Sequence, residues 1–179
     1  MSKQLRPTDV KRLNRTWRRN TANRVALIVE SVTGPFNVGS IFRSAAAFGV
    51  ERIWLAGNTT PPTNPKAGKT ALGTDRLVAW KDSVPVLQAV QEARDDGYAV
   101  LALELTADAV PLHKARLDRD VCLLVGSEDH GCSPAALAAA DGACYIPQVG
   151  RVGSFNVAVA AAIALAEARR QEWQNLSDL

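Results

Sequence analysis

Residues 146–160 contain a change from a strand pattern to a loop and then to a helix pattern, which indicates the type of fold. Their sequence is Ile-Pro-Gln-Val-Gly-Arg-Val-Gly-Ser-Phe-Asn-Val-Ala-Val-Ala. Pro147 cannot continue a central strand, because it has no N–H group to donate to a neighbouring strand. Gly150 and Gly153 let the backbone approach a ligand closely. The stretch therefore predicts a strand that ends near Ile146, followed by a loop rich in backbone donors.

The loop leads into a run of small apolar residues. Ser154 and Asn156 stand where a helix begins and needs side-chain caps. Residues 157–166 are all Val, Ala, Ile or Leu, which predicts a helix that is buried on nearly every face. Small polar residues are common before apolar helices, so these residues taken alone also fit a plain connection from a strand to a helix.

Strand and helix patterns alternate along the rest of the chain. Residues 57–76 are rich in turn residues and read as a long loop. Because a strand, helix, strand order implies parallel neighbours, we expect an α/β fold with a mostly parallel sheet flanked by helices. The expected strands are 25–30, 52–56, 77–80, 98–103 and 121–125, and the expected helices are 37–48, with Asn37 as N-cap, and 84–96.

The composition fits an ordinary globular domain. The 179 residues are 47% apolar, which is enough for a sizeable core. No stretch resembles a membrane span or a secretory signal, so we expect a cytoplasmic protein without a membrane partner. Cys122 and Cys144 read as core residues, and His130 with Cys132 lacks the further ligands of a zinc centre. We therefore expect neither disulfides nor a metal.

Positive charge is concentrated at the amino terminus. Residues 1–24 carry eight Lys or Arg against one Asp, which is 8 − 1 = +7, and the remaining chain carries 13 − 17 = −4. The helical spacing of Val10, Leu13 and Trp17, with Thr8 as N-cap, predicts a basic and partly helical extension. A solvated tail is the alternative. The residues expected to contact nucleic-acid phosphates are Lys11, Arg12, Arg15, Arg18 and Arg19.

Two further motifs lie at the ends of predicted strands. Asn37, Gly39 and Arg43 form the pattern Asn-x-Gly-x-x-x-Arg, which on residue types alone also fits a capped helix with a surface arginine. The strand at 121–125 leads into Gly-Ser-Glu-Asp-His-Gly, residues 126–131, which places Glu128 in a loop bounded by glycines. No Gly-x-Gly-x-x-Gly follows the first strand and no Gly-x-Ser-x-Gly is present, which argues against a dinucleotide-binding protein and a hydrolase.

Together the three motifs, in this order, resemble those of the SpoU/TrmH family of RNA 2'-O-ribose methyltransferases, within the SPOUT superfamily. The resemblance runs from Asn37 to Ala160, and residues 69–73, Lys-Thr-Ala-Leu-Gly, are also similar to a segment of that family. It implies that residues 25–179 form a SPOUT methyltransferase domain with a deep trefoil knot in its carboxyl-terminal part. It also implies a homodimer in which the carboxyl-terminal helix packs on its symmetry mate.

The resemblance implies transfer of a methyl group from S-adenosylmethionine to a ribose of structured RNA. We expect tRNA rather than rRNA, with a D-loop guanosine as target. A ribosomal RNA enzyme, a non-catalytic RNA-binding SPOUT module and an enzyme that methylates a base nitrogen are the alternatives. Gln148 and Phe155 replace the Met and Leu of many relatives, which leaves the shape of the cofactor pocket open but not the reaction class.

Roles follow from the same resemblance. Arg43 would place and activate the ribose, and the residues that orient it and the loops would be Asn37, Glu128, Ser154 and Asn156. The cofactor would be held by Leu103, Leu105, Thr106, Gly126, Ile146, Gln148, Ser154, Phe155 and Asn156. Besides Arg43 and the basic extension, RNA would contact Lys66 and Lys69.

Overall fold

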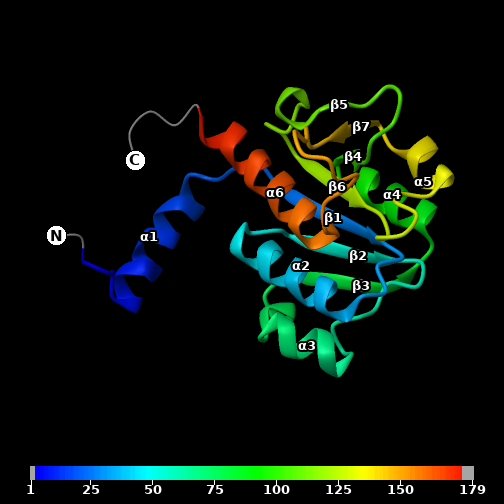
Figure 1. Cartoon of the computed structure of the whole chain (residues 1–179). Helices are drawn as coiled ribbons and strands as arrows, with labels where there is room; N and C mark the ends of the chain where they lie inside the picture. The colour runs from blue at the N-terminus through cyan, green and yellow to red at the C-terminus, as the bar shows by residue number, and fades with distance from the viewer. Residues whose placement is uncertain (1–2, 175–179) are drawn as a thin grey trace.

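The computed structural model describes residues 3–174 and contains one seven-stranded sheet (Figure 1). The strand order is β3-β2-β1-β6-β4-β7-β5, and every neighbouring pair in the sheet is parallel. The mostly parallel α/β sheet expected from the sequence is thereby confirmed. The strands are β1 Val25–Glu30, β2 Arg52–Ala56, β3 Ala79–Val84, β4 Ala99–Leu103, β5 Val110–Pro111, β6 Val121–Val125 and β7 Gly142–Tyr145.

Helices cover both faces of the sheet (Figure 1). One core packs beneath α2 and α6, and a second core packs beneath α4 and α5. Strands β1 and β6 are buried along their whole length, as is usual for central parallel strands that read as continuous apolar runs. The helices are α1 Pro7–Arg19, α2 Pro35–Ala47, α3 Pro65–Ala71, α4 Val86–Asp95, α5 Pro134–Ala139 and α6 Val157–Trp173, with short 3₁₀ turns η1 Thr74–Arg76 and η2 Leu112–Lys114.

Several expected boundaries are wrong. Helix α2 begins at Pro35 after Gly34, so Asn37 lies inside its first turn and is not the N-cap. The predicted loop 57–76 contains α3 and η1, and α3 packs so closely on α2 that a Cβ at Gly39 would overlap the Ala67 carbonyl. The strand expected at 77–80 begins only at Ala79.

Helix α6 is also less buried than expected. Its inner face lies in the core, but Val159 is 48% exposed and Ala166 is exposed as well. Asn156 caps α6 as predicted, because its side-chain oxygen accepts hydrogen bonds from the amides of Ala158 and Val159. The helix therefore presents an apolar strip to the outside of this chain.

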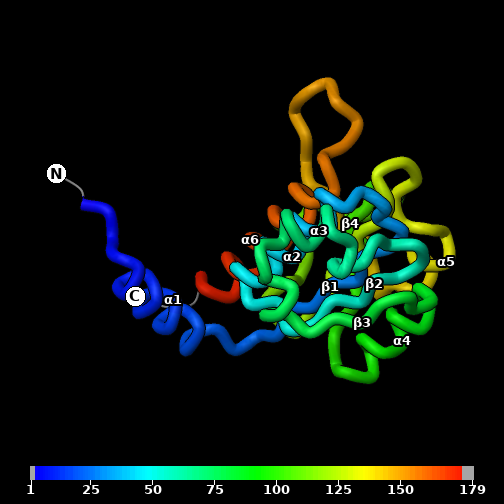
Figure 2. The backbone as a smooth tube through the Cα atoms, turned by 90° about the horizontal axis from the view of Figure 1, so that it is seen from below, coloured from blue at the N-terminus to red at the C-terminus, as the bar shows by residue number. Residues whose placement is uncertain are grey.

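The basic extension is helical, as expected, but Thr8 does not cap it. Arg6 occupies the N-cap position of α1 without a side-chain cap bond, and no residue of α1 is buried. The helix stands away from the body in both views (Figures 1 and 2), and its aromatic contact is Trp17 on Trp173, with ring centroids 4.7 Å apart. The division of the chain at residue 24 stays a prediction, and its outermost residues, 1–2 and 175–179, lie outside the described part.

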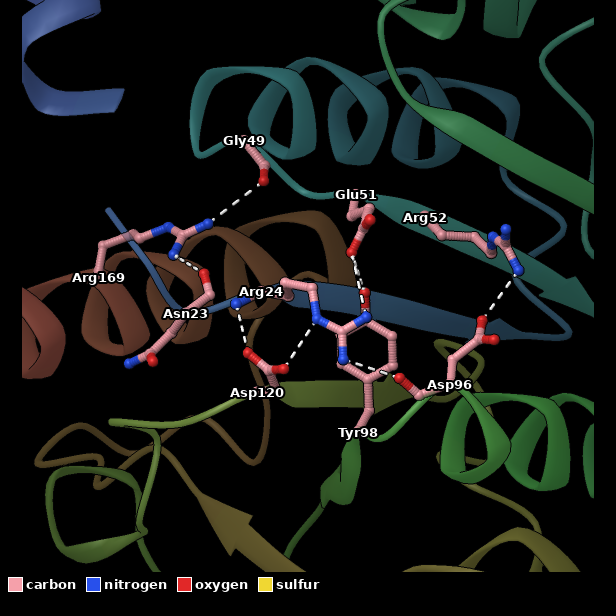
Figure 3. A network of polar contacts seen from close by, with 9 residues as sticks. All are labelled: Asn23, Arg24, Gly49, Glu51, Arg52, Asp96, Tyr98, Asp120 and Arg169. Atoms are coloured by element: carbon pink, nitrogen blue, oxygen red, sulfur yellow. Dashed lines mark hydrogen bonds and ion pairs between the residues drawn. The ribbon is translucent and has the colours of Figure 1, made fainter. Parts of the chain in front are cut away.

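The link between α1 and the sheet is held by charged side chains (Figure 3). Buried Arg169, on α6, donates to the Asn23 carbonyl at 2.8 Å and pairs with Glu172 at 2.7 Å. Glu172 in turn accepts the amides of residues 22 and 23 at 2.6 and 2.7 Å. Arg24 pairs with Asp120 at 2.8 Å and lies over the Tyr98 ring. The last turn of α6 therefore fixes the base of the extension.

In residues 3–174, no helix has the length and apolar character that crossing a membrane requires.

Candidate functional site

A pocket lies where the carboxyl ends of β4, β6 and β7 meet the first turn of α6. Parallel strands bring their carboxyl ends to one edge of the sheet, where ligands of α/β proteins collect. The pocket has a volume of about 210 Å³. Its lining residues are Leu103, Glu104, Leu105, Val125, Gly126, Ser127, Glu128, Gly131, Tyr145, Ile146, Gln148, Gly153, Ser154, Phe155, Val157 and Ala160.

The turn after β6 forms one wall of the pocket. Ser127 and Gly131 exchange two backbone hydrogen bonds, of 3.1 and 2.9 Å, which close a tight turn around Glu128. A Cβ at Gly126 would overlap backbone atoms of Gly131 and Cys132. Gly131 itself has a φ of +66°, in the left-handed region. Both glycines of the Gly-x-Glu-x-x-Gly motif are therefore required by the shape of this turn.

The loop between β7 and α6 forms the opposite wall. Figure 2 shows this loop, in orange, standing out from the body of the molecule. Its apolar side chains are largely in solvent, with Val149 fully exposed, Val152 69% exposed and Phe155 39% exposed. No Cβ at Gly150 or Gly153 would meet another atom within 4 Å. Each of these two glycines could therefore carry a Cβ without a clash.

A chain of side-chain hydrogen bonds joins the three motifs. The Asn37 amide donates to the Glu128 carboxylate, and the Asn156 amide donates to Asn37 Oδ1 at 2.9 Å. Asn156 Oδ1 then accepts the Ala158 amide at 3.0 Å. The structure thus brings Asn37, Glu128 and Asn156 together, although they are far apart in the sequence. Asn37 serves as a bridge between two loops of the pocket.

Arg43 is not part of this chain of contacts. It is exposed on α2, it does not line the pocket, and within residues 3–174 its guanidinium has no hydrogen-bond or ion-pair partner. It follows Asn37 by six residues, which is about 9 Å along the helix axis and on another face. The structure therefore leaves Arg43 available to a molecule outside this chain.

The remaining predicted positions divide into two groups. The lining contains every predicted cofactor residue except Thr106 and Asn156. Thr106 does not line the pocket, and its hydroxyl instead donates a hydrogen bond to the Asp108 carboxylate at 2.7 Å. The basic residues Lys66 and Lys69 lie exposed on α3, and Lys11, Arg12, Arg15, Arg18 and Arg19 lie exposed on α1.

Two carboxylates near the pocket were not singled out from the sequence. Glu104 lines the pocket, and Glu30 is only 6% exposed behind the same turn. Burial, followed by the charges of Glu104 and Glu30, raises the pKa of the Cys132 thiol, so this cysteine stays protonated near neutral pH. An acidic residue at the end of an apolar strand is a signal that could have pointed to both glutamates.

The residues 3–174 contain no group of three or more His, Cys, Asp or Glu side chains placed to hold a metal ion. The pocket instead combines apolar walls from Leu103, Ile146 and Phe155 with the carboxylates of Glu104 and Glu128. Such walls suit a ligand that has both a flat apolar part and a positive charge.

Comparisons with known proteins agree with the geometry. The sequence profile of the SpoU rRNA Methylase family matches residues 24–166, a region that contains the whole pocket lining. A tRNA (guanosine(18)-2'-O)-methyltransferase of Thermus thermophilus is 34% identical over 149 residues, which make up 82% of this chain and 75% of that protein. The chain spans only 54% of another curated relative, an uncharacterized tRNA/rRNA methyltransferase of Synechocystis that is 33% identical over 84% of this chain.

Solved structures show the same fold. An AdoMet-bound rRNA methyltransferase from Sinorhizobium meliloti has a TM-score of 0.78 at 29% identity, and the match covers 85% of this chain and 58% of that one. A structure concerned with the 2-OH methylation of C/U34 on tRNA has a TM-score of 0.74 at 29% identity, covering 83% of this chain and 96% of that one.

Proposed function

Since the chain belongs to the SpoU rRNA Methylase family, we propose that it transfers a methyl group from S-adenosylmethionine to a ribose 2'-hydroxyl of structured RNA. The observation that carries the proposal is the hydrogen-bonded chain Glu128–Asn37–Asn156, which ties the three family motifs to one pocket. A relative whose structure contains AdoMet supports the choice of cofactor. The retained polar positions argue against a non-catalytic module.

The pocket fits this cofactor in its chemistry. The apolar side chains would enclose the adenine, and Glu104 and Glu128 would face the positive charges of the ligand. When bound, S-adenosylmethionine supplies an electrophilic methyl group. Backbone groups of the loops at Gly126 and at residues 146–154 would fix its position, and Asn37 and Asn156 would keep the two loops in register. No metal is part of the proposal.

Arg43 would act on the RNA. A guanidinium stays protonated and is a poor base, whereas its planar set of donors suits a phosphate held by two hydrogen bonds. Arg43 would thereby hold the ribose hydroxyl in line with the methyl group. Reactants held in this geometry react as in a unimolecular step, which lowers the free-energy barrier of the transfer. Because Arg43 lies outside the pocket of its own chain, we place it at the pocket of the partner in a homodimer.

The exposed apolar strip of α6 supports this homodimer. Val159 and Ala166 lie on the outer side of a helix whose inner side packs in the core. Two-fold dimers are the commonest assemblies of soluble proteins, and small side chains let two helices approach closely. In the same proposal the protein works in the cytoplasm.

We also propose that the carboxyl-terminal part forms a trefoil knot, and the order of the strands in the sheet supports this. After the edge strand β5, the chain returns to place β6 between β1 and β4, and then places β7 between β4 and β5. These two returns to inner positions of the sheet support a threaded carboxyl-terminal part, which in the proposal ends with α6.

Transfer RNA is the proposed substrate, and a D-loop guanosine is the first target to test. The Thermus thermophilus relative acts on guanosine 18 of tRNA according to its name, and 82% of this chain aligns with it. The structure concerned with C/U34 is almost wholly covered by this chain, which makes the ribose of tRNA position 34 the second candidate. Ribosomal RNA is the alternative substrate, because the Sinorhizobium meliloti relative is named as an rRNA methyltransferase.

The proposed function predicts that total tRNA, but not rRNA, accepts label from S-adenosylmethionine when EDTA is present. Nucleoside mapping should place the methyl group on a ribose oxygen. Calorimetric titration of the protein with S-adenosylmethionine provides the control, because a ligand of the native state must bind and raise the melting temperature. Absence of binding, or label on a base, would refute the proposal, and label confined to rRNA would refute its choice of substrate.

The basic face of α1 predicts a salt-dependent contribution to RNA binding. Neutralising four of its cations should weaken tRNA binding and make its dependence on salt less steep, because each lost phosphate contact lowers the slope by about 0.9 or less. Cofactor affinity should not change. The variant to measure in filter-binding titrations at several salt concentrations combines Gln substitutions at Lys11, Arg12, Arg15 and Arg19.

A control variant separates this effect from loss of overall charge. Arg52→Gln with Arg94→Gln removes two positive charges, but these side chains are paired with Asp96 and Asp141 away from α1. If the salt slope falls equally per charge removed in both variants, α1 has no specific part in RNA binding.

A further inference from the structure

Two carboxylates grip the turn that follows the central strand β6. Glu104 Oε2, from the end of β4, accepts the Cys132 amide at 3.0 Å. Glu30 Oε2, from the end of β1, accepts the Ser133 amide at 2.9 Å. These amides are consecutive, and β6 lies between β1 and β4 in the sheet. Each neighbouring strand therefore supplies one carboxylate to the same short segment. We call Glu30 and Glu104 the carboxylate clamp.

Glu30 is an unusual residue for its place in the fold. It is 6% exposed at the end of a strand whose other residues are apolar and buried. Removing a carboxylate from water is costly unless hydrogen bonds compensate for it, and an apolar residue of similar size would fill a core position without that cost. Stability of the sheet alone does not account for a glutamate here.

Glu104 packs against the same turn on the side that faces the pocket. Its Oε1 accepts the Leu105 amide at 3.0 Å, so the side chain is folded back against its own strand end. A Cβ at Gly131 would overlap the Glu104 carboxylate, and one at Gly126 would overlap Gly131. The turn is therefore confined between the end of β6 on one side and the Glu104 carboxylate on the other.

The confined segment carries the groups that the pocket uses. Residues 126–131 include Gly126 and Glu128, both of which line the pocket, and Glu128 accepts a hydrogen bond from Asn37. If the amides of Cys132 and Ser133 lost their acceptors, water would have to replace them in a partly buried place, and the turn could move away from Asn37. The position of Glu128 therefore depends on the clamp.

We propose that Glu30 and Glu104 are positioning residues of the cofactor site, which hold the turn at residues 126–133 in the shape that binds S-adenosylmethionine. This inference rests on the proposed function. Glu104 has a second effect, because its carboxylate lines the pocket and its charge favours a cationic ligand, whereas Glu30 acts only through the turn.

The test compares Glu30→Gln and Glu104→Gln with the wild-type protein, since glutamine keeps the size of the side chain and limits damage to the fold. Hydrogen exchange of the Cys132 and Ser133 amides, measured by NMR without ligand, should become about tenfold to a hundredfold faster, as expected for weakened hydrogen bonds to charged groups. The dissociation constant of S-adenosylmethionine, measured by calorimetry, should rise by a similar factor. At saturating cofactor, turnover should return to within about twofold of wild type, because Arg43 and the RNA contacts are unchanged.

Glu92→Gln is the matched control. Glu92 also accepts a side-chain hydrogen bond, from Trp54 at 2.8 Å, but it lies on α4 outside the pocket. It should affect melting temperature without changing cofactor affinity or the exchange of the two amides. Substitution of Glu104 should in addition weaken binding of S-adenosylmethionine more than binding of its neutral-sulfur product, and substitution of Glu30 should weaken both equally.

The possible outcomes distinguish failure of the proposed function from failure of the carboxylate clamp. If the wild-type protein does not bind S-adenosylmethionine, the proposed function fails, and the amide exchange still reports whether the clamp holds the turn. If the wild-type protein binds and both glutamine variants bind equally well, with unchanged exchange, the clamp is refuted. A fall in turnover that saturating cofactor does not restore would also contradict a positioning role.

Discussion

Replacing Arg43 with alanine is expected to lower the rate of methyl transfer by about a hundredfold, the usual effect when a reacting group is misplaced by about 1 Å. The dissociation constant of S-adenosylmethionine should stay nearly unchanged, because in the proposal Arg43 contacts the RNA and not the cofactor. Arg43→Lys should fail almost as fully, since a lysine lacks the planar pair of donors. Single-turnover assays with tRNA, alongside calorimetry, measure both quantities.

Arg52→Ala is the control for loss of an arginine. Arg52 is likewise exposed, but it pairs with Asp96 at 3.0 Å at the amino-terminal ends of the strands. Exposed ion pairs of this kind contribute about 0–1 kcal/mol to stability, so activity should be retained. If Arg43→Ala turns over like Arg52→Ala, Arg43 has no part in the reaction.

Mixed dimers test whether Arg43 acts in its partner's site. A subunit with Arg43→Ala keeps its pocket, and a subunit with a disabled pocket keeps Arg43. When two inactive homodimers of these kinds exchange subunits, one complete site should form and activity should reappear. An active monomer in light scattering, or no recovery on mixing, would contradict an arginine supplied by the partner.

The second large effect is expected at Gly126. An alanine Cβ at this position would overlap backbone atoms of Gly131 and Cys132, which cannot move aside as a flexible side chain can. The turn around Glu128 would have to open, and affinity for S-adenosylmethionine should fall by about a hundredfold or more, which corresponds to roughly 3 kcal/mol. Calorimetric titration measures the loss.

Gly150→Ala is the matched variant for Gly126→Ala. Both glycines lie on loops that border the pocket, but a Cβ at Gly150 would meet no atom within 4 Å. This variant should bind the cofactor like the wild-type protein and melt at nearly the same temperature. Equal losses of affinity in the two variants would mean that loop flexibility, rather than the close packing of Gly126 on Gly131, is what the site requires.

The central strands could be predicted because a strand that is buried on both faces has a continuous run of apolar residues. β1 and β6 are continuous apolar runs, and both were found with their observed bounds. Helix α3 departs from the predicted loop because Pro65 and Gly68 resemble loop residues, although Asn64 caps this helix and Pro65 stands in its first turn, which is a local helix-start signal. The close packing of α3 on Gly39 of α2 joins residues far apart along the chain, so no local pattern reports that contact.

Contacts between residues far apart in the sequence also limit how much of the site can be predicted. Asn37 was expected to cap its own helix, which is the commonest local use of an asparagine at such a position. Its actual partners, Glu128 and Asn156, lie 91 and 119 residues further along the chain. The position of Glu30 and Glu104 at the ends of apolar strands marks them as unusual, but their partners are backbone amides, which no sequence pattern identifies. Many of the motif residues line one pocket, and only the folded chain shows which contacts join them.

Helix α6 is also a spacer of fixed length. Its first turn is capped by Asn156 at the pocket, and its last turn, through Glu172, fixes the base of α1. Its 17 residues span about 25 Å at 1.5 Å per residue. In the proposed function, an RNA held on α1 would have its reactive ribose about this far from the base of α1. The length of a single helix would then limit which nucleotides can reach the transferred methyl group.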